Sequence, residues 1–164
     1  MNSPTNSADE AFFDAEWMFG INEGFDIVIG NPPYGANIDN LVPLFERLYP
    51  NTTKGFKDIY KLFIEAGLLG LTNRLGILAY ITPNTLLRQP RYKDARSFLR
   101  QFRLLQVMDF GLGVFEQVVP TCVFTVQKCS GENNIVLYRD LTVQSHFSGS
   151  IGSVTAKAIP RMPF

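Results

Sequence analysis

The sequence lacks an excess of charge of either sign, because 15 Lys and Arg residues balance 15 Asp and Glu residues. A complete DNA-binding protein usually carries a basic face, so the overall charge does not predict a nucleic-acid partner. Apolar runs stay well short of the ~20 residues that span a bilayer, so no membrane segment is predicted. With 46% apolar and 18% charged residues, the composition is typical of a folded globular domain.

Cysteine and histidine are also scarce, with two and one residues respectively. Cys122 and Cys129 lie in one strand-like stretch at a spacing that points them to opposite faces, so a mutual disulfide is not expected. His146 has no carboxylate close in sequence, and we expect it at the surface. No metal site and no Ser–His–Asp or Cys–His arrangement is predicted. Free thiols are typical of the reducing cytoplasm, where we expect this chain.

Hydrophobic periodicity predicts one α/β domain over residues 21–140, preceded by an irregular lead-in at 1–20 and followed by a weakly structured tail at 141–164. We expect strands at Phe25–Gly30, 75–81, 104–110, 121–127 and 134–139, and helices at 40–48, 57–71 and 93–103. The third and fourth strands are too close for a crossover helix and must form an antiparallel hairpin. The order predicts a doubly wound α/β sheet ending in that hairpin, with Phe25–Gly30 covered on both faces.

The first of these strands runs directly into Asn31-Pro32-Pro33-Tyr34. A given tetrapeptide occurs by chance in a chain of this length on the order of once in a thousand, at about 5% usage per residue type. The same residues can also form a rigid strand-to-loop turn that carries no chemistry, because Pro-Pro makes turns and Asn tolerates them. The position after a buried strand favours a functional reading.

The residue types of this tetrapeptide suit a planar amine, such as the exocyclic NH₂ of adenine. Such a nitrogen is a poor nucleophile because its lone pair is delocalised into the ring, and acceptors on its two protons return that pair to nitrogen. The Asn31 side chain and the Pro32 main chain each offer a carbonyl acceptor. Each proline locks its own φ and restricts the preceding residue. Tyr34 offers a flat face for stacking a base, worth roughly 1–3 kcal/mol.

Further segments recur with this motif in one known family. They are Asp58-Ile59-Tyr60-Lys61-Leu62-Phe63-Ile64-Glu65, Arg74-Leu75-Gly76-Ile77-Leu78-Ala79-Tyr80-Ile81-Thr82-Pro83-Asn84, Asp109-Phe110-Gly111, Val114-Phe115-Glu116 and Val119-Pro120-Thr121-Cys122-Val123. With Asn31-Pro32-Pro33-Tyr34 they resemble the class I S-adenosylmethionine-dependent DNA adenine amino-methyltransferases. Within that group, the chain looks most like the methylase portion of type IIG restriction–modification enzymes.

The resemblance implies S-adenosylmethionine as cofactor, DNA as partner and a Rossmann-like fold. It implies that Asn31 and Pro32, within the catalytic Asn-Pro-Pro-Tyr motif that also includes Pro33, bind the amino group. Tyr34 and Phe115 would then clamp the extruded base. From the residues alone, Phe115 is more often a packing residue. Tyr60 and Phe63 are candidates to flank the cofactor adenine, although their helical spacing favours core packing.

One departure from the family is the missing glycine-rich cofactor loop. No Gly-x-Gly occurs in the first 24 residues, where Gly20 and Gly24 stand alone. We therefore expect the carboxyl-terminal half of a methyltransferase domain, inactive by itself. The strand at Phe25–Gly30 would then have a bare edge, which predicts self-association or coverage by the lead-in.

Basic residues cluster after the second strand. Arg88 and Arg91 are candidates for contacts with the DNA backbone, whereas a solvated helix face explains Arg100 and Arg103. Two other methyl acceptors stay open: a glutamine side-chain amide in a protein, which presents the same planar NH₂, and the exocyclic amine of cytosine. A non-catalytic remnant or binding module that keeps only the fold is a third interpretation.

Overall fold

The structure, a computed structural model, describes residues 15–35, 38–55, 57–112, 119–132, 134–142 and 155–160. These residues form a six-stranded mixed sheet in the order β1-β2-β4-β3-β5-β6. The strands are β1 (Phe25–Gly30), β2 (Thr72–Pro83), β3 (Phe102–Gly111), β4 (Thr121–Ser130), β5 (Ile135–Asp140) and β6 (Lys157–Pro160). The mixed α/β sheet predicted from the sequence is confirmed.

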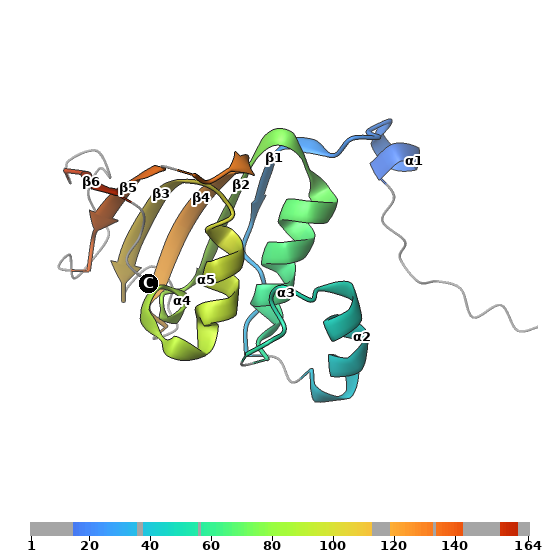
Figure 1. The fold of residues 1–164 in the computed structure, drawn as a ribbon, viewed down its shortest axis with the longest axis horizontal. Helices are drawn as coiled ribbons and strands as arrows, with labels where there is room; N and C mark the ends of the chain where they lie inside the picture. The colour runs from blue at the N-terminus through green and yellow to red at the C-terminus, as the bar shows by residue number, and fades with distance from the viewer. Residues whose placement is uncertain are drawn as a thin grey trace, which may run out of the picture.

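The helical segments α3, α4 and α5 cross one face of this sheet, while α1 and α2 lie beyond the β1 side (Figure 1). They are α1 (Ala15–Phe19), η1 (Asp39–Leu41), α2 (Val42–Leu48), α3 (Ile59–Ala66), η2 (Gly67–Leu71), α4 (Thr85–Arg88), η3 (Pro90–Tyr92) and α5 (Lys93–Leu99). The predicted helix at 57–71 is therefore present, but its last part is a π-helical turn.

The predicted hairpin is confirmed, and its second strand is inserted into the sheet. β4 is antiparallel to β3 on one side and to β2 on the other. β1 pairs parallel with β2, and β5 pairs parallel with β3. Consequently β1, β2, β3 and β5 all end at the same edge of the sheet, where β4 begins.

The structure contains two short elements that were not predicted from the sequence. The lead-in contains the helix α1, which ends on Gly20 at a φ of 68°, with Gly20 N–H donating to Glu16 O and Ile21 N–H to Ala15 O. This is the glycine cap that commonly closes helices. The tail contains β6, which pairs with β5 through Val136 and Ile159. Its weak Ser- and Gly-rich surroundings concealed this short apolar stretch.

The helix predicted at 93–103 is shorter in the structure, where α5 ends at Leu99. Gln101 N–H donates to Phe98 O and closes the helix, and β3 begins at the next residue. The Phe102 ring then packs edge-on against Phe98 at 5.2 Å between centroids. This contact favours a tight turn between helix and strand.

The core lies between the sheet and the three helices α3, α4 and α5. Its members are buried side chains from the central strands and from the inner helix faces, among them Leu78, Phe124, Ile64, Leu86 and Phe98. Phe124, at 1% exposure, packs edge-on against Tyr80. Burying apolar side chains of this size contributes about 1.5–3 kcal/mol each relative to leaving them exposed, so this face carries much of the stability.

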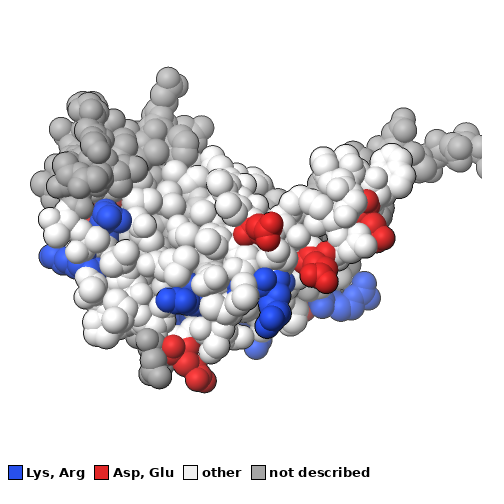
Figure 2. All heavy atoms as spheres, turned by 90° about the horizontal axis from the view of Figure 1, so that it is seen from above, with Lys and Arg blue, Asp and Glu red and all other residues white. Residues whose placement is uncertain are grey.

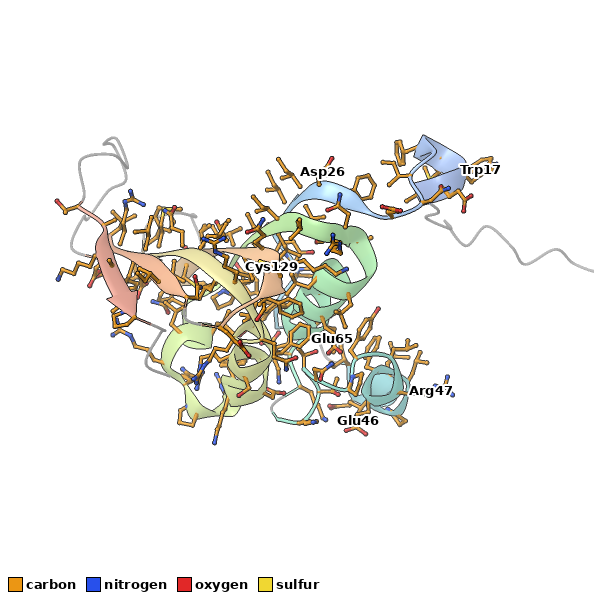
Figure 3. All side chains as sticks on the ribbon, turned by 45° about the horizontal axis from the view of Figure 1, so that its top comes forward. Trp17, Asp26, Glu46, Arg47, Glu65 and Cys129 are labelled. Carbon is orange, nitrogen blue, oxygen red and sulfur yellow. The ribbon has the colours of Figure 1, made fainter. Side chains whose placement is uncertain are left out.

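Two buried charged side chains of α3 hold the connecting segments in place. Lys61 pairs with Asp94 of α5 at 2.7 Å, and Asp94 also accepts a hydrogen bond from Gly55 N–H. Glu65 points from α3 toward the segment after α2 (Figure 3). Its carboxylate accepts hydrogen bonds from main-chain and side-chain groups of Asn51 and Thr52. The segment leading into α3 is thereby fixed against that helix.

The edge strand β1 is covered much less than predicted. Ile27 and Ile29 are 63% and 78% exposed, whereas Val28 packs against the core. The expectation that both faces of this strand are covered is therefore wrong for the described residues. Among the described strands, β1 is an edge strand that pairs only with β2. The described helices pack on the face of the sheet that carries Val28, and Ile27 and Ile29 lie on the other face.

Candidate catalytic edge

Polar side chains, among them the predicted site residue Asn31, gather where the parallel strands end. Asn31 follows β1, Asn84 follows β2, and Asp109 lies near the end of β3. Thr121 opens β4 at the same edge. Ligand sites of open α/β sheets form outside the carboxyl ends of the strands, so this edge is the candidate site.

The Asn-Pro-Pro-Tyr turn leaves β1 with its polar group toward solvent. Asn31 and Pro33 are exposed, Pro32 is buried, and Tyr34 is half-buried and packs against the core. Just before the turn, Gly30 faces the ring of Tyr80, and a Cβ at Gly30 would lie 2.9 Å from Tyr80 Cε1. The turn therefore presents the exposed amide of Asn31 close in sequence to the Tyr34 ring, which packs against the core.

Asn84 and Asp109 join the ends of β2, β3 and β4 through one hydrogen-bond network. Asn84 Nδ2 donates to Asp109 Oδ1 at 2.9 Å, and Asn84 N–H donates to Pro120 O at 2.9 Å. The same Asp109 oxygen accepts a hydrogen bond from Gly111 N–H, whose residue has a φ of 63°. Asp109 is 2% exposed, so the network forms a buried floor at this edge.

The two arginines predicted to contact DNA both lie at this edge. Arg88 Nη2 is 3.6 Å from Asp109 Oδ2, and the Arg88 side chain is 71% exposed. Arg91 is exposed, and its guanidinium carbon lies 5.1 Å from the centre of the Tyr92 ring. Arg96, in the same basic run, instead donates to Leu86 O and Gln89 O and is buried. Arg96 thus has a structural role.

The two aromatic residues predicted to flank a cofactor have different positions. Tyr60 is fully buried and packs against Tyr92 at 5.6 Å between ring centroids, and burial raises the pKa of its phenol. Phe63 is 41% exposed and lines an open hollow of about 490 Å³ with Leu69 and Tyr80. Phe63 can thus reach a ligand, and Tyr60 packs in the core. Phe115 and His146 lie outside the described residues.

Sequence reasoning missed three polar residues of this edge: Asp58, Asn84 and Asp109. Each belongs to a segment that carried the family resemblance, but none was assigned a role. The signal available was a polar residue directly at a strand or helix end, namely before α3 and at the ends of β2 and β3. Their side-chain hydrogen bonds to other elements span 23 to 34 residues of sequence, so spacing alone does not reveal these contacts.

Figure 2 presents the opposite end of the molecule, where β2 begins, and shows scattered charges of both signs around a broad uncharged area there. Within the described ranges, no group of three or more His, Cys, Asp or Glu side chains is arranged to hold a metal ion. None of the helices in these ranges has the length and apolar character needed to cross a bilayer.

Comparison with known proteins agrees with the geometry. Residues 2–115 match the model of the Eco57I restriction-modification methylase family. The Escherichia coli type II restriction enzyme and methyltransferase RM.Eco57I is 32% identical over 147 residues, which is 80% of this chain and 14% of that protein. The chain therefore spans about a seventh of that relative's length.

Solved structures show the same fold at low sequence identity. A putative class I S-adenosylmethionine-dependent methyltransferase from Listeria monocytogenes matches with a TM-score of 0.59 and 18% identity, over 76% of this chain and 39% of that one. The type IIG restriction endonuclease BpuSI matches with a TM-score of 0.62 and 22% identity, over 83% and 19% respectively. Together with the family match over residues 2–115, these findings show that the chain belongs to the Eco57I restriction-modification methylase family.

Proposed function

We propose that this chain carries the catalytic edge of a DNA adenine amino-methyltransferase, which transfers a methyl group from S-adenosylmethionine to the exocyclic amine of adenine. The observation that carries the proposal is the position of Asn31. Its side chain is exposed directly after a parallel strand, and it is followed by a buried Pro32 and a core-anchored Tyr34. Membership of a restriction-modification methylase family supports DNA as the partner.

The chemistry of the turn is hydrogen-bond acceptance and positioning. Asn31 Oδ1 and Pro32 O accept the two protons of the amine and localise its lone pair, and Tyr34 stacks on the base. An Asn side chain cannot remove a proton, so no general base is assigned in this turn. Removing one preorganised hydrogen-bonding group of this kind commonly raises the activation barrier by about 3–4 kcal/mol. Tyr34 is half-buried, and its contacts with the core position its ring beside the turn.

The described residues supply only part of a cofactor site. The hollow beside Phe63 and Tyr80 provides one aromatic wall, while Tyr60 is sealed in the core. When bound, S-adenosylmethionine supplies the electrophilic methyl group. The edge of β1 that has no partner among the described strands lies on the side where the family's cofactor-binding strand is expected, so we propose that the 164-residue chain alone is inactive.

The experiment uses the longest natural form of this protein, methyl-labelled S-adenosylmethionine and adenine-containing duplex DNA, with identification of the labelled product. We expect label in N6-methyladenine and none with the 164-residue chain alone. Label found instead in N4-methylcytosine, or in a glutamine amide of an added protein substrate, would show that adenine is not the methyl acceptor. Absence of transfer to any of these would favour the non-catalytic remnant. Transfer by the short chain would contradict the incomplete cofactor site.

We also propose that the β1 edge associates with a second copy of the chain or with the lead-in at 1–20. Ile27 and Ile29 expose apolar surface along a strand whose outer edge has no partner in the described sheet. Such edges pair readily with other strands. Sedimentation of the 164-residue chain should show dimers or larger species that I29K shifts to monomer. Removing residues 1–20 takes away the other segment that could cover the edge. If the chain without these residues, and with Ile29 intact, is still monomeric, the proposal is contradicted.

A further inference from the structure

Beyond the strand ladder, the described turn has one hydrogen bond to another element. Gly35 N–H donates to Asp58 Oδ1 at 3.3 Å, across 23 residues of sequence. Gly35 has a φ of 73°, a left-handed conformation that glycine adopts without strain. Because Gly35 directly follows Tyr34, the bond fixes the peptide unit at the exit of the Asn-Pro-Pro-Tyr turn.

The carboxylate of Asp58 is used in an unusual way for its position. Asp58 is the N-cap residue of α3, with φ −132° and ψ 130°, and an Asp there normally caps its own helix. In this structure its side chain makes no capping hydrogen bond. The two carboxylate oxygens instead accept hydrogen bonds from Gly35 N–H and from Tyr92 OH, the second at 3.4 Å.

Asp58 lies at the start of α3, where its side chain contacts two other segments of the chain. It is 9% exposed, and the positive end of the α3 dipole stabilises a carboxylate at that point. Tyr92 is 2% exposed, packs on Tyr60 and carries the Arg91 guanidinium over its ring. Asp58 therefore joins the exit of the turn, the start of α3 and the basic segment around Arg91.

We propose that Asp58 is a positioning residue, which holds the Asn-Pro-Pro-Tyr turn in its working conformation by binding Gly35 N–H. The catalytic consequence rests on the proposed function, but the contact itself does not. When this bond is lost, Gly35 can leave the left-handed conformation and carry Tyr34 and the Pro32 carbonyl with it. A displacement of about 1 Å at a reacting centre can cost on the order of 100-fold in rate.

Three substitutions separate positioning from helix stability. Asp58→Ser keeps a residue that caps helices well but is too short to reach Gly35. Asp58→Asn keeps a side-chain carbonyl able to accept the Gly35 hydrogen bond. Tyr92→Phe is the matched control, since it removes the other hydrogen bond to the Asp58 carboxylate and leaves the Gly35 bond in place.

The first measurement is amide hydrogen exchange at Gly35 in the longest natural form of the protein. We expect exchange at Gly35 to become at least about tenfold faster in Asp58→Ser, which corresponds to a loss of about 1.4 kcal/mol in the free energy that protects this amide. In Asp58→Asn and Tyr92→Phe the exchange rate should stay within about threefold of the parent. Unchanged exchange in Asp58→Ser would overturn the proposal. This outcome is independent of whether the protein methylates DNA.

The second measurement is methyl transfer by the same variants. Asp58→Ser should lower kcat by about 10- to 100-fold while KM for DNA changes less than about threefold, as expected when only transition-state alignment is lost. Asp58→Asn should recover most of kcat, and the melting temperature of Asp58→Ser should remain close to that of Tyr92→Phe. A kcat unchanged in Asp58→Ser, or a loss in Asp58→Asn as large as in Asp58→Ser, would also overturn it.

Discussion

The strands β1 and β4 are similar in composition but differ in their surroundings. Both contain a run of apolar and β-branched residues, and both border the candidate catalytic edge. Among the described strands, β4 lies between two neighbours with Phe124 and Val126 buried, whereas β1 has one neighbour and exposes Ile27 and Ile29. The difference shows that an apolar strand next to the candidate catalytic residues can be either a buried central strand or an exposed edge strand.

The largest expected contrast is in stability. Phe124→Ala should lower the free energy of unfolding by about 3–5 kcal/mol, since it opens a cavity in a packed core. Ile29→Ala removes a side chain that is 78% exposed, and its cost should stay within about 0.5 kcal/mol. Denaturant unfolding of both variants, at a protein concentration at which sedimentation shows monomers, measures the difference. A comparable loss in Ile29→Ala would mean that the lead-in covers the β1 surface within one chain.

A smaller effect is expected where β1 meets β2. Gly30→Ala places a Cβ 2.9 Å from the Tyr80 ring and should cost about 1–3 kcal/mol, because an overpacked contact forces the ring to shift. Gly70→Ala is the matched control, since a Cβ there meets nothing within 4 Å. It should leave stability unchanged or raise it by up to about 1 kcal/mol. Equal stability of the two variants would show that Tyr80 is not fixed against β1.

A separate contrast, seen only at high pH, concerns the two thiols of β4. Burial raises the pKa of Cys122 to about 12, while Cys129 is partly exposed near the end of the strand. In the native protein a thiol reagent should modify Cys129 and spare Cys122 until unfolding. The free energy of unfolding should also fall between about pH 9 and pH 12, because the unfolded Cys122 thiol ionises first.

The Cys122→Ala variant provides the control for this pH dependence. Other groups that titrate in the same range remain in the variant, so the part of the slope that Cys122 causes is the difference between the two proteins. An identical slope in both would contradict a raised thiol pKa. Rapid modification of both cysteines in the native protein would contradict the central position of β4.

The sequence predicted the elements better than their surroundings. Period and spacing located the strands, the α3 helix and the β3–β4 hairpin, because local pattern and loop length determine them. The same apolar pattern did not show that Ile27 and Ile29 lie open, because coverage depends on what packs across the sheet. The short helix α1 and the strand β6 were missed because each is only four or five residues long.

The candidate site was predictable in the same uneven way. Asn31 and Tyr34 stood out because an uncommon tetrapeptide followed a buried strand, and both lie at the predicted edge. The contacts that hold the edge were not predictable, since Asp58 meets Gly35 and Asp109 meets Asn84 only after folding. The placement of Phe115 remains a prediction, because this residue lies outside the described ranges.

The most direct test of the central claim is the Asn31→Ala variant of the longest natural form of the protein. Methyl transfer to adenine and DNA affinity should be measured side by side under single-turnover conditions. If Asn31 accepts a proton of the amine, the transfer rate should fall by at least about 100-fold, comparable to the loss of one preorganised hydrogen-bond group, while DNA affinity changes less than about threefold. A parallel loss of both, or retention of transfer, would contradict the account.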